Sequence, residues 1–390
     1  MVEEADALAR ILVAARPIEA TTLPLREALG FFLAKPIRST LAHPRFDNSV
    51  VDGYAIRVED GLGKRKIIGE QPAGQDRSLR LETDEAIRIF TGAPIPEGCN
   101  GVVMQEDITV DAGQFILQKS VELGENIRRK GADLAAGQLI ARVGDRVTPQ
   151  LIGLLASQGL ATVTVHQAPR VVILSTGDEL RHAGAQLAPG EIYESNSGML
   201  SALLQPLGIF ADVRHCPDDR DALEIEIQKA LSGNDVLIIS GGVSVGDHDH
   251  VRPALTNLGI KIDLWQIRMK PGKPLAFAQV KEKLIFGLPG NPVASFVTFL
   301  VLVRPALLQM LGAQDEDRFL SKRFVQLASE ISNPGKRPHY IRGNYLNGRF
   351  ICNRLQESHA LFGLSQSNAL LRVEAETHLL ADEEYKVLVW

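Results

Sequence analysis

The chain has 390 residues, 45% of them hydrophobic and 23% charged, and a formal net charge of -5. Its length exceeds what one compact core usually holds, so we expect two to four domains. No long block of like charge is present, which argues against nucleic acid as a partner.

The N-terminus and the cysteines indicate a soluble, cytoplasmic protein. The first residues carry acids where a secretory signal would carry bases. The longest apolar run, at 293–303, is too short for a membrane span, and we expect a buried helix there. Cys99, Cys216 and Cys352 lie far apart, without zinc-site or disulfide-framework spacing, as in a reducing compartment.

The predicted secondary structure changes along the N-terminal region. Residues 1–16 have the apolar spacing of a helix. From about 20 to 145, short β-like runs alternate with glycine and proline turns, which predicts a β-rich region. A helix is predicted over 148–160, with Thr148 as its cap, Pro149 at its first position and Gly159 at its end.

Between about 168 and 312, strand-like and helix-like segments alternate. This pattern predicts a parallel sheet covered by helices on both faces. Ligands of such sheets bind beyond the carboxyl ends of the strands. After the charged stretch at 312–318, the tail from about 316 returns to short β-like segments.

The stretch "SGGVSVGDHDHV" at 240–251 follows a predicted strand and supports three interpretations. Its glycines and the following helix start suit a phosphate-binding loop. The same glycines suit a tight strand–helix turn without ligand. Asp247, His248, Asp249 and His250 also resemble four metal ligands, and histidine nitrogen would favour zinc or nickel over magnesium.

Acids follow other predicted strands. Asp178 and Glu179 follow one strand, and Asp218 and Asp219 follow another. With Asp249 they could hold Mg²⁺ through oxygen ligands. The alternative is that each acid caps a helix, and this alternative is strongest for Asp218.

Lysines and prolines end two further segments. Lys270 and Lys273 lie in "MKPGKP", which suits a polyanion site or a solvated basic turn. Pro289 and Pro292 lie in "GLPGNPVAS", which suits a ligand loop or simple helix capping, with Asn291 as the cap. In the N-terminal region, three further polar candidates, Asp52, Thr91 and Asp133, lie in stretches that by themselves indicate turns.

Taken in order, "FDNSVVDGYA", "TGAPIP", "NIRRKGAD", "STGDEL", "PDD", "SGGVSVGDHD", "MKPGKP" and "GLPGNPVAS" resemble the motifs of the molybdopterin molybdenumtransferases, the family of bacterial MoeA and the gephyrin E domain. The resemblance covers nearly the whole chain. It departs at Val51, where the family has Met, and it is weakest in the C-terminal region, where "QESHALFGLSQSNAL" carries it.

The resemblance implies a reaction. Molybdate is inserted into adenylylated molybdopterin, magnesium assists, and AMP is released. It assigns catalytic roles to Asp52, Thr91, Asp133, Glu179 and Asp219. It assigns substrate binding to Gly241, Gly242, Ser244, Gly246, Asp249, Lys270, Lys273, Pro289 and Pro292, and magnesium binding to Asp219 and Asp249. It also implies a homodimer in which N-terminal motifs of one subunit face the α/β domain of the other.

The implied fold is multidomain α+β. It combines an elongated β-rich N-terminal domain, a three-layer α/β domain with a mostly parallel sheet, and a C-terminal β-barrel-like domain. The expected boundaries are 1–19 with 134–167 for a small discontinuous domain, 20–133 for the β-rich domain, 168–315 for the α/β domain and 316–390 for the C-terminal domain.

Three alternatives stay open. Molybdopterin adenylyltransferases share the α/β motifs but lack the long N-terminal region and "DGYA". A non-enzymatic scaffold like gephyrin belongs to a different class. Tungstate could replace molybdate as the preferred oxyanion.

For "GDHDH", the resemblance singles out only Asp249 and makes His248 and His250 ordinary residues of a helix start.

Overall fold

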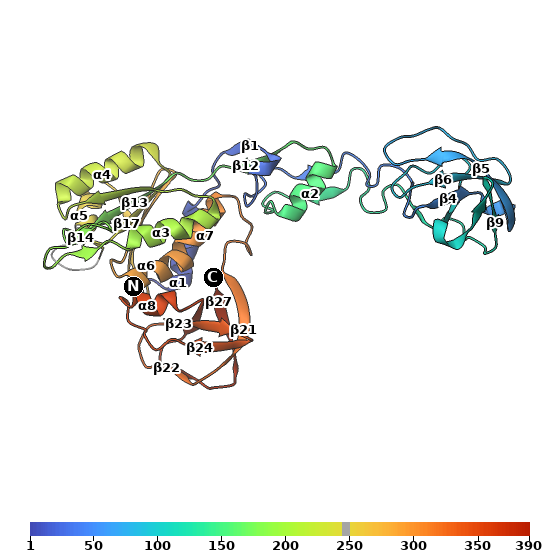
Figure 1. The fold of residues 1–390 in the computed structure, drawn as a ribbon. Coiled ribbons are helices and arrows are strands. Elements are labelled where there is room, and N and C mark those ends of the chain that lie inside the picture. Colours follow the sequence, from blue (N-terminus) through green and yellow to red (C-terminus); the bar gives the residue numbers. More distant parts are fainter. Residues whose placement is uncertain (244–249) are drawn as a thin grey trace. The chain divides into compact units, whose positions relative to one another are not determined.

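The structure is a computed structural model that describes residues 1–243 and 250–390. The chain forms two compact units (Figure 1). Unit 1 comprises Met1–Lys35, Val143–Gly153 and Leu160–Trp390, and unit 2 comprises Pro36–Arg142 and Leu154–Gly159. The predicted division into four domains stays a prediction.

A six-stranded sheet forms the centre of unit 1. Its order is β16 (Asp212–Cys216), β13 (Val171–Thr176), β17 (Val236–Ser240), β20 (Lys283–Leu288), β19 (Pro274–Val280) and β18 (Ile262–Gln266). The first four strands are parallel, whereas β19 and β18 run antiparallel to their neighbours. The carboxyl ends of the parallel strands therefore meet at one edge, where ligands of such sheets bind.

Helices cover both faces of this sheet, as Figure 1 shows. Along β13, side chains alternate between two cores because successive strand residues point to opposite faces. One core contains helices α4 (Arg220–Gly233) and α5 (Val251–Asn257). The other contains α1 (Glu4–Ala14), α3 (Asn196–Leu204), α6 (Pro292–Thr298) and α7 (Arg304–Met310). The predicted three-layer α/β arrangement is confirmed.

Strands β18 and β19, and with them the β19–β20 hairpin, are not predicted by the sequence pattern. The two strands of the hairpin are joined at Lys281 and Glu282, and Lys281 has a positive φ of 56°. Asn-Gly or Asp-Gly usually marks a two-residue hairpin turn, and neither dipeptide is present here. The usual turn dipeptides therefore do not predict this hairpin.

The apolar stretch at 293–303 lies in a helical segment, Pro292–Met310, that passes from α6 through a π-helical turn, Phe299–Val303, into α7. This segment is long and apolar enough to cross a membrane by length and composition, and 83% of its most apolar window is buried inside the protein. A core helix of a soluble protein passes the same test.

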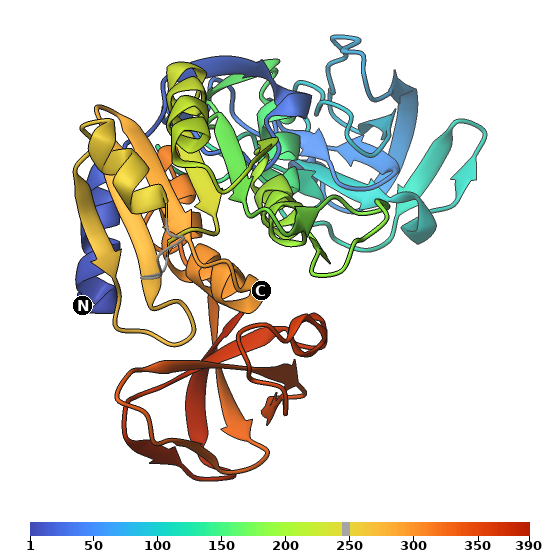
Figure 2. The same cartoon turned by 90° about the vertical axis from the view of Figure 1, so that its left-hand side faces the viewer.

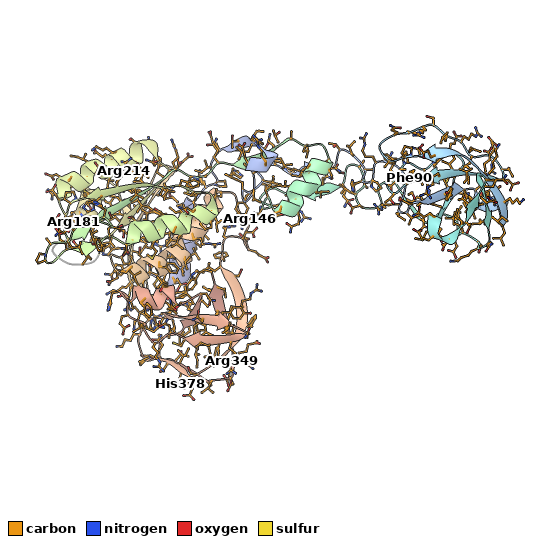
Figure 3. The ribbon with its side chains drawn as sticks, in the orientation of Figure 1. Phe90, Arg146, Arg181, Arg214, Arg349 and His378 are labelled. Atoms are coloured by element: carbon orange, nitrogen blue, oxygen red, sulfur yellow. The ribbon has the colours of Figure 1, made fainter. Side chains whose placement is uncertain are left out.

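The C-terminal region closes into a barrel with the core residues Val325, Leu327, Ile341, Phe350 and Val387 (Figure 2, red strands). Its strands are β21 (Ser321–Leu327), β24 (Arg349–Cys352), β23 (His339–Leu346), β25 (Ala369–Val373) and β27 (Glu384–Val389). Near it lie β22 (Ile331–Asn333), β26 (Thr377–Leu379) and α8 (Leu361–Ser365). Figure 3 labels Arg349 on barrel strand β24, His378 on the neighbouring strand β26, and Arg181 and Arg214 in the α/β region. The predicted C-terminal barrel is confirmed.

Unit 2 is built on a second six-stranded sheet, in the order β7 (Gly101–Met104), β4 (Gly53–Ile56), β6 (Glu85–Ile89), β5 (Gly63–Gln71), β9 (Gln114–Leu117) and β8 (Val110–Asp111). Alternation along β4 sends Tyr54 and Ile56 into one core and Ala55 into another. The predicted β-rich region is confirmed.

The remaining elements are short. The pairs are β1 (Ala20–Pro24) with β12 (Thr162–His166), β2 (Ile37–Arg38) with β11 (Leu139–Ala141), β3 (Asn48–Ser49) with β10 (Ile127–Arg128), and β14 (Leu180–Arg181) with β15 (Ile192–Tyr193). Helix α2 covers Pro149–Ser157, and Thr148 Oγ1 accepts a hydrogen bond from Leu151 N at 3.2 Å, as predicted for its cap.

Candidate functional site

A cavity of about 740 Å³ lies at the carboxyl ends of β13, β17 and β20 in unit 1. We name it the glycine cavity and define it by the residues Thr176, Glu179, Asn196, Asp218, Gly241 and Gly242. Pro289 and Pro292 also line it. The structure thus brings five of the predicted site residues, Glu179, Gly241, Gly242, Pro289 and Pro292, to one cavity.

Backbone geometry explains the two glycines. Gly241 has a φ of 102° and Gly242 a φ of 62°, which side chains rarely allow. A Cβ atom on Gly241 would lie 2.8 Å from the carbonyl oxygen of Thr176. The chain can therefore leave β17 and pass beside β13 only with glycine at this position.

The predicted site residues Ser244, Gly246 and Asp249 lie outside the described residues, as do Asp247 and His248. The structure does not bear on the four-ligand interpretation or on the role of Asp249. His250 stands immediately before α5, at its N-cap position, which agrees with a helix start.

The two adjacent aspartates after β16 have different roles. Asp218 accepts a hydrogen bond from Thr176 Oγ1 at 2.6 Å and faces the glycine cavity. Its backbone N–H donates to Asp178 Oδ1 at 3.1 Å. Asp219 is the N-cap of α4, and its Oδ1 accepts from Ala222 N at 2.8 Å.

The alternative interpretation of Asp218, as the cap of this helix, is therefore wrong. Asp219 has the extended backbone of an N-cap residue, with φ -119° and ψ 127°, so the helix starts one residue later than expected. That shift leaves the Asp218 carboxylate to the cavity. The catalytic and magnesium-binding roles of Asp219 stay predictions.

Asn196 is a cavity residue that sequence reasoning missed. At the start of α3, its Nδ2 donates to Ser240 Oγ at 2.9 Å and to Gly290 O at 2.8 Å. It thereby joins α3 to the end of β17 and to the loop before α6. Within the part of the chain that the structure describes, its buried Oδ1 has no hydrogen-bond partner. The polar stretch at 194–197 before a predicted helix was the only available signal.

A second cavity, of about 450 Å³, shares Pro274, Pro289 and Asn291 with the glycine cavity. We name it the lysine cavity and define it by Lys270, Lys273, Arg337, His339, Glu357 and Ser358. The structure brings the two predicted lysines together here. The three positive charges exceed the single carboxylate, so the cavity suits an anion.

Hydrogen bonds join the C-terminal barrel to the loop at 269–274, which we name the lysine loop. Lys270 N donates to Pro338 O at 2.8 Å, and Tyr340 N donates to Lys270 O at 2.7 Å. Arg337 Nη1 donates to Met269 O at 2.9 Å. Sequence reasoning missed Arg337, which lies where the resemblance is weakest, and Ser358, although Ser358 lies in the quoted stretch "QESHALFGLSQSNAL".

A buried arginine, Arg342, binds the loop at 355–358, which also lines this cavity. Arg342 is 0% exposed, and its Nη2 donates to the carbonyl oxygens of Leu355 at 2.6 Å and Glu357 at 3.1 Å. Val293 N, at the start of α6, donates to Ser358 O at 3.1 Å. The barrel loop at 355–358 is therefore fixed against both the barrel and the α/β layer.

The described residues do not form a magnesium site. They contain no group of three or more histidine, cysteine, aspartate or glutamate side chains placed to hold a metal ion. Asp219 is engaged as a helix cap, and Asp249 is not described. The predicted magnesium site stays a prediction.

In unit 2, the structure pairs Asp52 with Thr91. Asp52 Oδ1 accepts hydrogen bonds from Thr91 N and Thr91 Oγ1, both at 2.8 Å. These two hydrogen bonds, and then the charge of Arg88, hold the pKa of Asp52 below its usual range. Asp52 is thus held as a carboxylate in a fixed orientation.

Asp133 lies on an exposed loop, and its backbone N–H donates to His43 O at 3.0 Å. Nearby in sequence, Lys130 N and Arg129 Nη1 both donate to Asp47, at 2.7 Å each. Lys130 N, then Arg129, lowers the pKa of Asp47. The predicted catalytic role of Asp133 stays a prediction.

Family profiles cover most of the chain in three consecutive regions. The MoeA N-terminal region (domain I and II) matches residues 2–159, the probable molybdopterin binding domain matches 172–309, and the MoeA C-terminal region (domain IV) matches 325–390. The order of these regions agrees with the order of the elements described above.

Similar proteins span the whole chain. A molybdopterin molybdenumtransferase of Nostoc sp. is 36% identical over 93% of this chain and 86% of its own length. Molybdopterin molybdenumtransferase 2 of Mycobacterium tuberculosis is 33% identical over 95% of this chain and 94% of its own. The crystal structure of the molybdopterin biosynthesis MoeA protein of Pyrococcus horikoshii OT3 is 29% identical, covers 100% of both chains and gives a TM-score of 0.87. By sequence and by fold, the chain belongs to the molybdopterin molybdenumtransferase family.

Proposed function

We propose that the chain inserts molybdate into adenylylated molybdopterin and releases AMP, with magnesium required. A role in molybdenum insertion follows from its family. One observation supports the complete reaction: two cavities of opposite charge share a wall formed by Pro274, Pro289 and Asn291. The reaction joins two substrates, an oxyanion and a phosphate-rich organic molecule, so it needs two distinct binding sites next to each other.

The lysine cavity suits the oxyanion. Lys270, Lys273 and Arg337 supply positive charge and N–H donors, and Ser358 supplies a hydroxyl group. Because the barrel strand β23 holds the backbone of Lys270 on both sides, this charge is positioned before the anion arrives. Preorganised charge of this kind stabilises an anion without reorganisation during the reaction.

The glycine cavity suits the pyrophosphate link of the second substrate. The backbone of Gly241 and Gly242 allows close approach, as phosphate groups require. In the reaction, water adds to one phosphorus of the phosphoanhydride, the bridging P–O bond breaks, and AMP leaves. At the shared wall the two dithiolene thiols form two Mo–S bonds, one Mo–O bond breaks, and the displaced oxygen leaves as water with the two thiol protons.

The carboxylates of Glu179, Glu194 and Asp218 also line the glycine cavity and would repel phosphate oxygens. A bound cation would offset this repulsion, and this is the physical reason to expect magnesium. The described residues do not by themselves form a site for this cation.

The decisive assay incubates the purified chain with adenylylated molybdopterin, molybdate and magnesium. AMP release is measured by chromatography, and cofactor formation by activation of a cofactor-free molybdenum enzyme. We expect both products, and loss of both on chelation of magnesium. ATP with molybdopterin tests the adenylyltransferase alternative, and tungstate tests the oxyanion preference. AMP release without cofactor formation would contradict the insertion step.

We further infer a homodimer in which Asp52 and Thr91 of one subunit act on the cavities of the other. The family resemblance supports this arrangement, together with the location of Asp52 in unit 2 and of Lys270 in unit 1. Chains with Asp52→Ala and chains with Lys270→Ala should each lose most of their activity and should regain activity as a mixed dimer. One site of the mixed dimer would carry both changes and the other neither. Verified heterodimers without activity would contradict the shared site.

A further inference from the structure

His339 is a buried imidazole in the wall of the lysine cavity. It begins strand β23 and is only 7% exposed. It also lines a third cavity, of about 560 Å³, in which Lys270 and Gln356 again take part. We name this third space the barrel cavity. His339 therefore stands between two spaces, beside the lysine predicted to bind the anion.

The ring of His339 lacks a hydrogen-bond partner that a buried imidazole nitrogen usually has. Its Nε2 is buried and has no hydrogen-bond partner among residues 1–243 and 250–390. A buried nitrogen without a partner is uncommon and costs free energy. An anion in the lysine cavity, which His339 lines, would supply a partner for the ring.

The surroundings of His339 are positively charged. Burial, and then the charges of Lys270, Arg342 and Arg337, lower its pKa from 6.5 to about 4. The other charged or titratable groups facing the two cavities are Lys273, Glu357, Glu330, Arg354 and Cys352. Without an anion, the imidazole is therefore neutral at neutral pH.

We propose that His339 is a binding residue of the oxyanion site, which hydrogen-bonds a tetrahedral dianion and takes up a proton from solvent as the dianion enters. This inference rests on the proposed function of the lysine cavity. The proton moves from solvent to the imidazole ring, and no bond of the oxyanion breaks. His339 thereby makes anion capture depend on pH.

The direction of this dependence follows from charge. A dianion beside the ring favours the imidazolium form, so the pKa of His339 rises when the anion binds. Binding then takes up protons, and by linkage the affinity increases as the pH falls toward the pKa of the anion-bound form. A singly charged anion would raise that pKa less. His339 therefore favours dianions over monoanions of similar size.

The test is calorimetric titration with molybdate at about pH 6.5, near the ordinary titration range of histidine. Repeating it in two buffers of different ionisation enthalpy gives the number of protons taken up. Sulfate, which has the same shape and stays a dianion over this range, serves as a second probe. The wild type should take up a fraction of a proton with either anion.

His339→Gln keeps a hydrogen-bonding side chain but cannot titrate. It should abolish the proton uptake and weaken binding by roughly tenfold or less, the effect of one charge-assisted hydrogen bond. His182→Gln, on an exposed turn, is the matched control and should retain the wild-type uptake. Unchanged proton uptake in His339→Gln would overturn the inference.

The outcomes separate this inference from the proposed function. If the wild type binds neither anion, the lysine cavity is not an oxyanion site and the proposed function loses its support. If the wild type binds molybdate without proton uptake, only the role of His339 is wrong. Should His339→Gln fail to fold, NMR of the ring signal of His339 in the wild type decides. A titration that molybdate does not move would then contradict the inference.

Discussion

The glycine cavity and the lysine cavity share three residues but carry opposite charge. The glycine cavity gathers carboxylates at the ends of sheet strands, whereas the lysine cavity gathers cations from a turn and from the C-terminal barrel. The difference shows how one sheet edge can present two chemical environments. Strand ends provide the acids, whereas the turn with Lys270 and Lys273 and the barrel residue Arg337 provide long basic side chains beyond a proline-rich wall. The predictions below test whether each cavity has the role proposed for it.

The largest effect is expected for Lys270→Ala. Removing one preorganised charge from the lysine cavity should lower molybdate affinity and cofactor formation on the order of 10²-fold. The side chain is exposed, so the free energy of unfolding should change by less than about 0.5 kcal/mol. Lys229→Ala, on the exposed face of α4, is the matched control and should change neither quantity. Equal anion binding by wild type and Lys270→Ala would erase the distinction between the cavities.

Gly241→Ala tests the backbone of the glycine cavity. The positive φ and the 2.8 Å approach to Thr176 O should together cost about 2–3 kcal/mol in the free energy of unfolding. Gly184→Ala provides the control, because Gly184 also has a positive φ, of 91°, but its added Cβ would meet nothing within 4 Å. Denaturant unfolding of both variants separates the contact from the strain. Equal losses would show that the close approach to Thr176 is unimportant.

Asp218→Asn and Asp219→Asn compare two neighbouring carboxylates. Asp218→Asn keeps an acceptor for Thr176 but removes a charge from the glycine cavity, so AMP release should slow about tenfold. Binding of molybdate alone should be unchanged. Asp219→Asn retains a good N-cap residue and should leave both activity and stability nearly intact. A larger loss for Asp219→Asn would instead support the role that the family resemblance assigns to Asp219.

The smallest effect concerns stability and pH in the lysine cavity. The pKa of His339 is about 4 in the folded chain and 6.5 as an ordinary value, so the unfolded chain binds more protons between these values. Stability from the neutral ring is therefore present above about pH 6.5 and decreases as the pH falls toward about 4. Between about pH 7.5 and about pH 5, the wild type should lose on the order of 1 kcal/mol more than His339→Gln. Parallel pH profiles in denaturant unfolding would contradict the buried, neutral state of His339.

Local sequence patterns predicted the architecture well where one segment determines its own structure. The apolar runs at 171–176 and 236–240 became buried parallel strands, and Thr148 with Pro149 began a helix as expected. Gly241 was singled out because a strand–glycine–helix sequence permits few backbone paths. These features depend on neighbouring residues, so they are readable from the sequence.

Tertiary structure alone decided which polar side chains meet. Whether Asp218 or Asp219 faces the cavity depends on the residue at which α4 begins, a one-residue choice that pattern cannot resolve. Asn196 reaches Ser240 and Gly290 only because α3 packs at the strand ends. Arg337, His339 and Ser358 join Lys270 because β23 forms backbone hydrogen bonds with the lysine loop. Such contacts between distant segments arise from packing, and no local pattern records them.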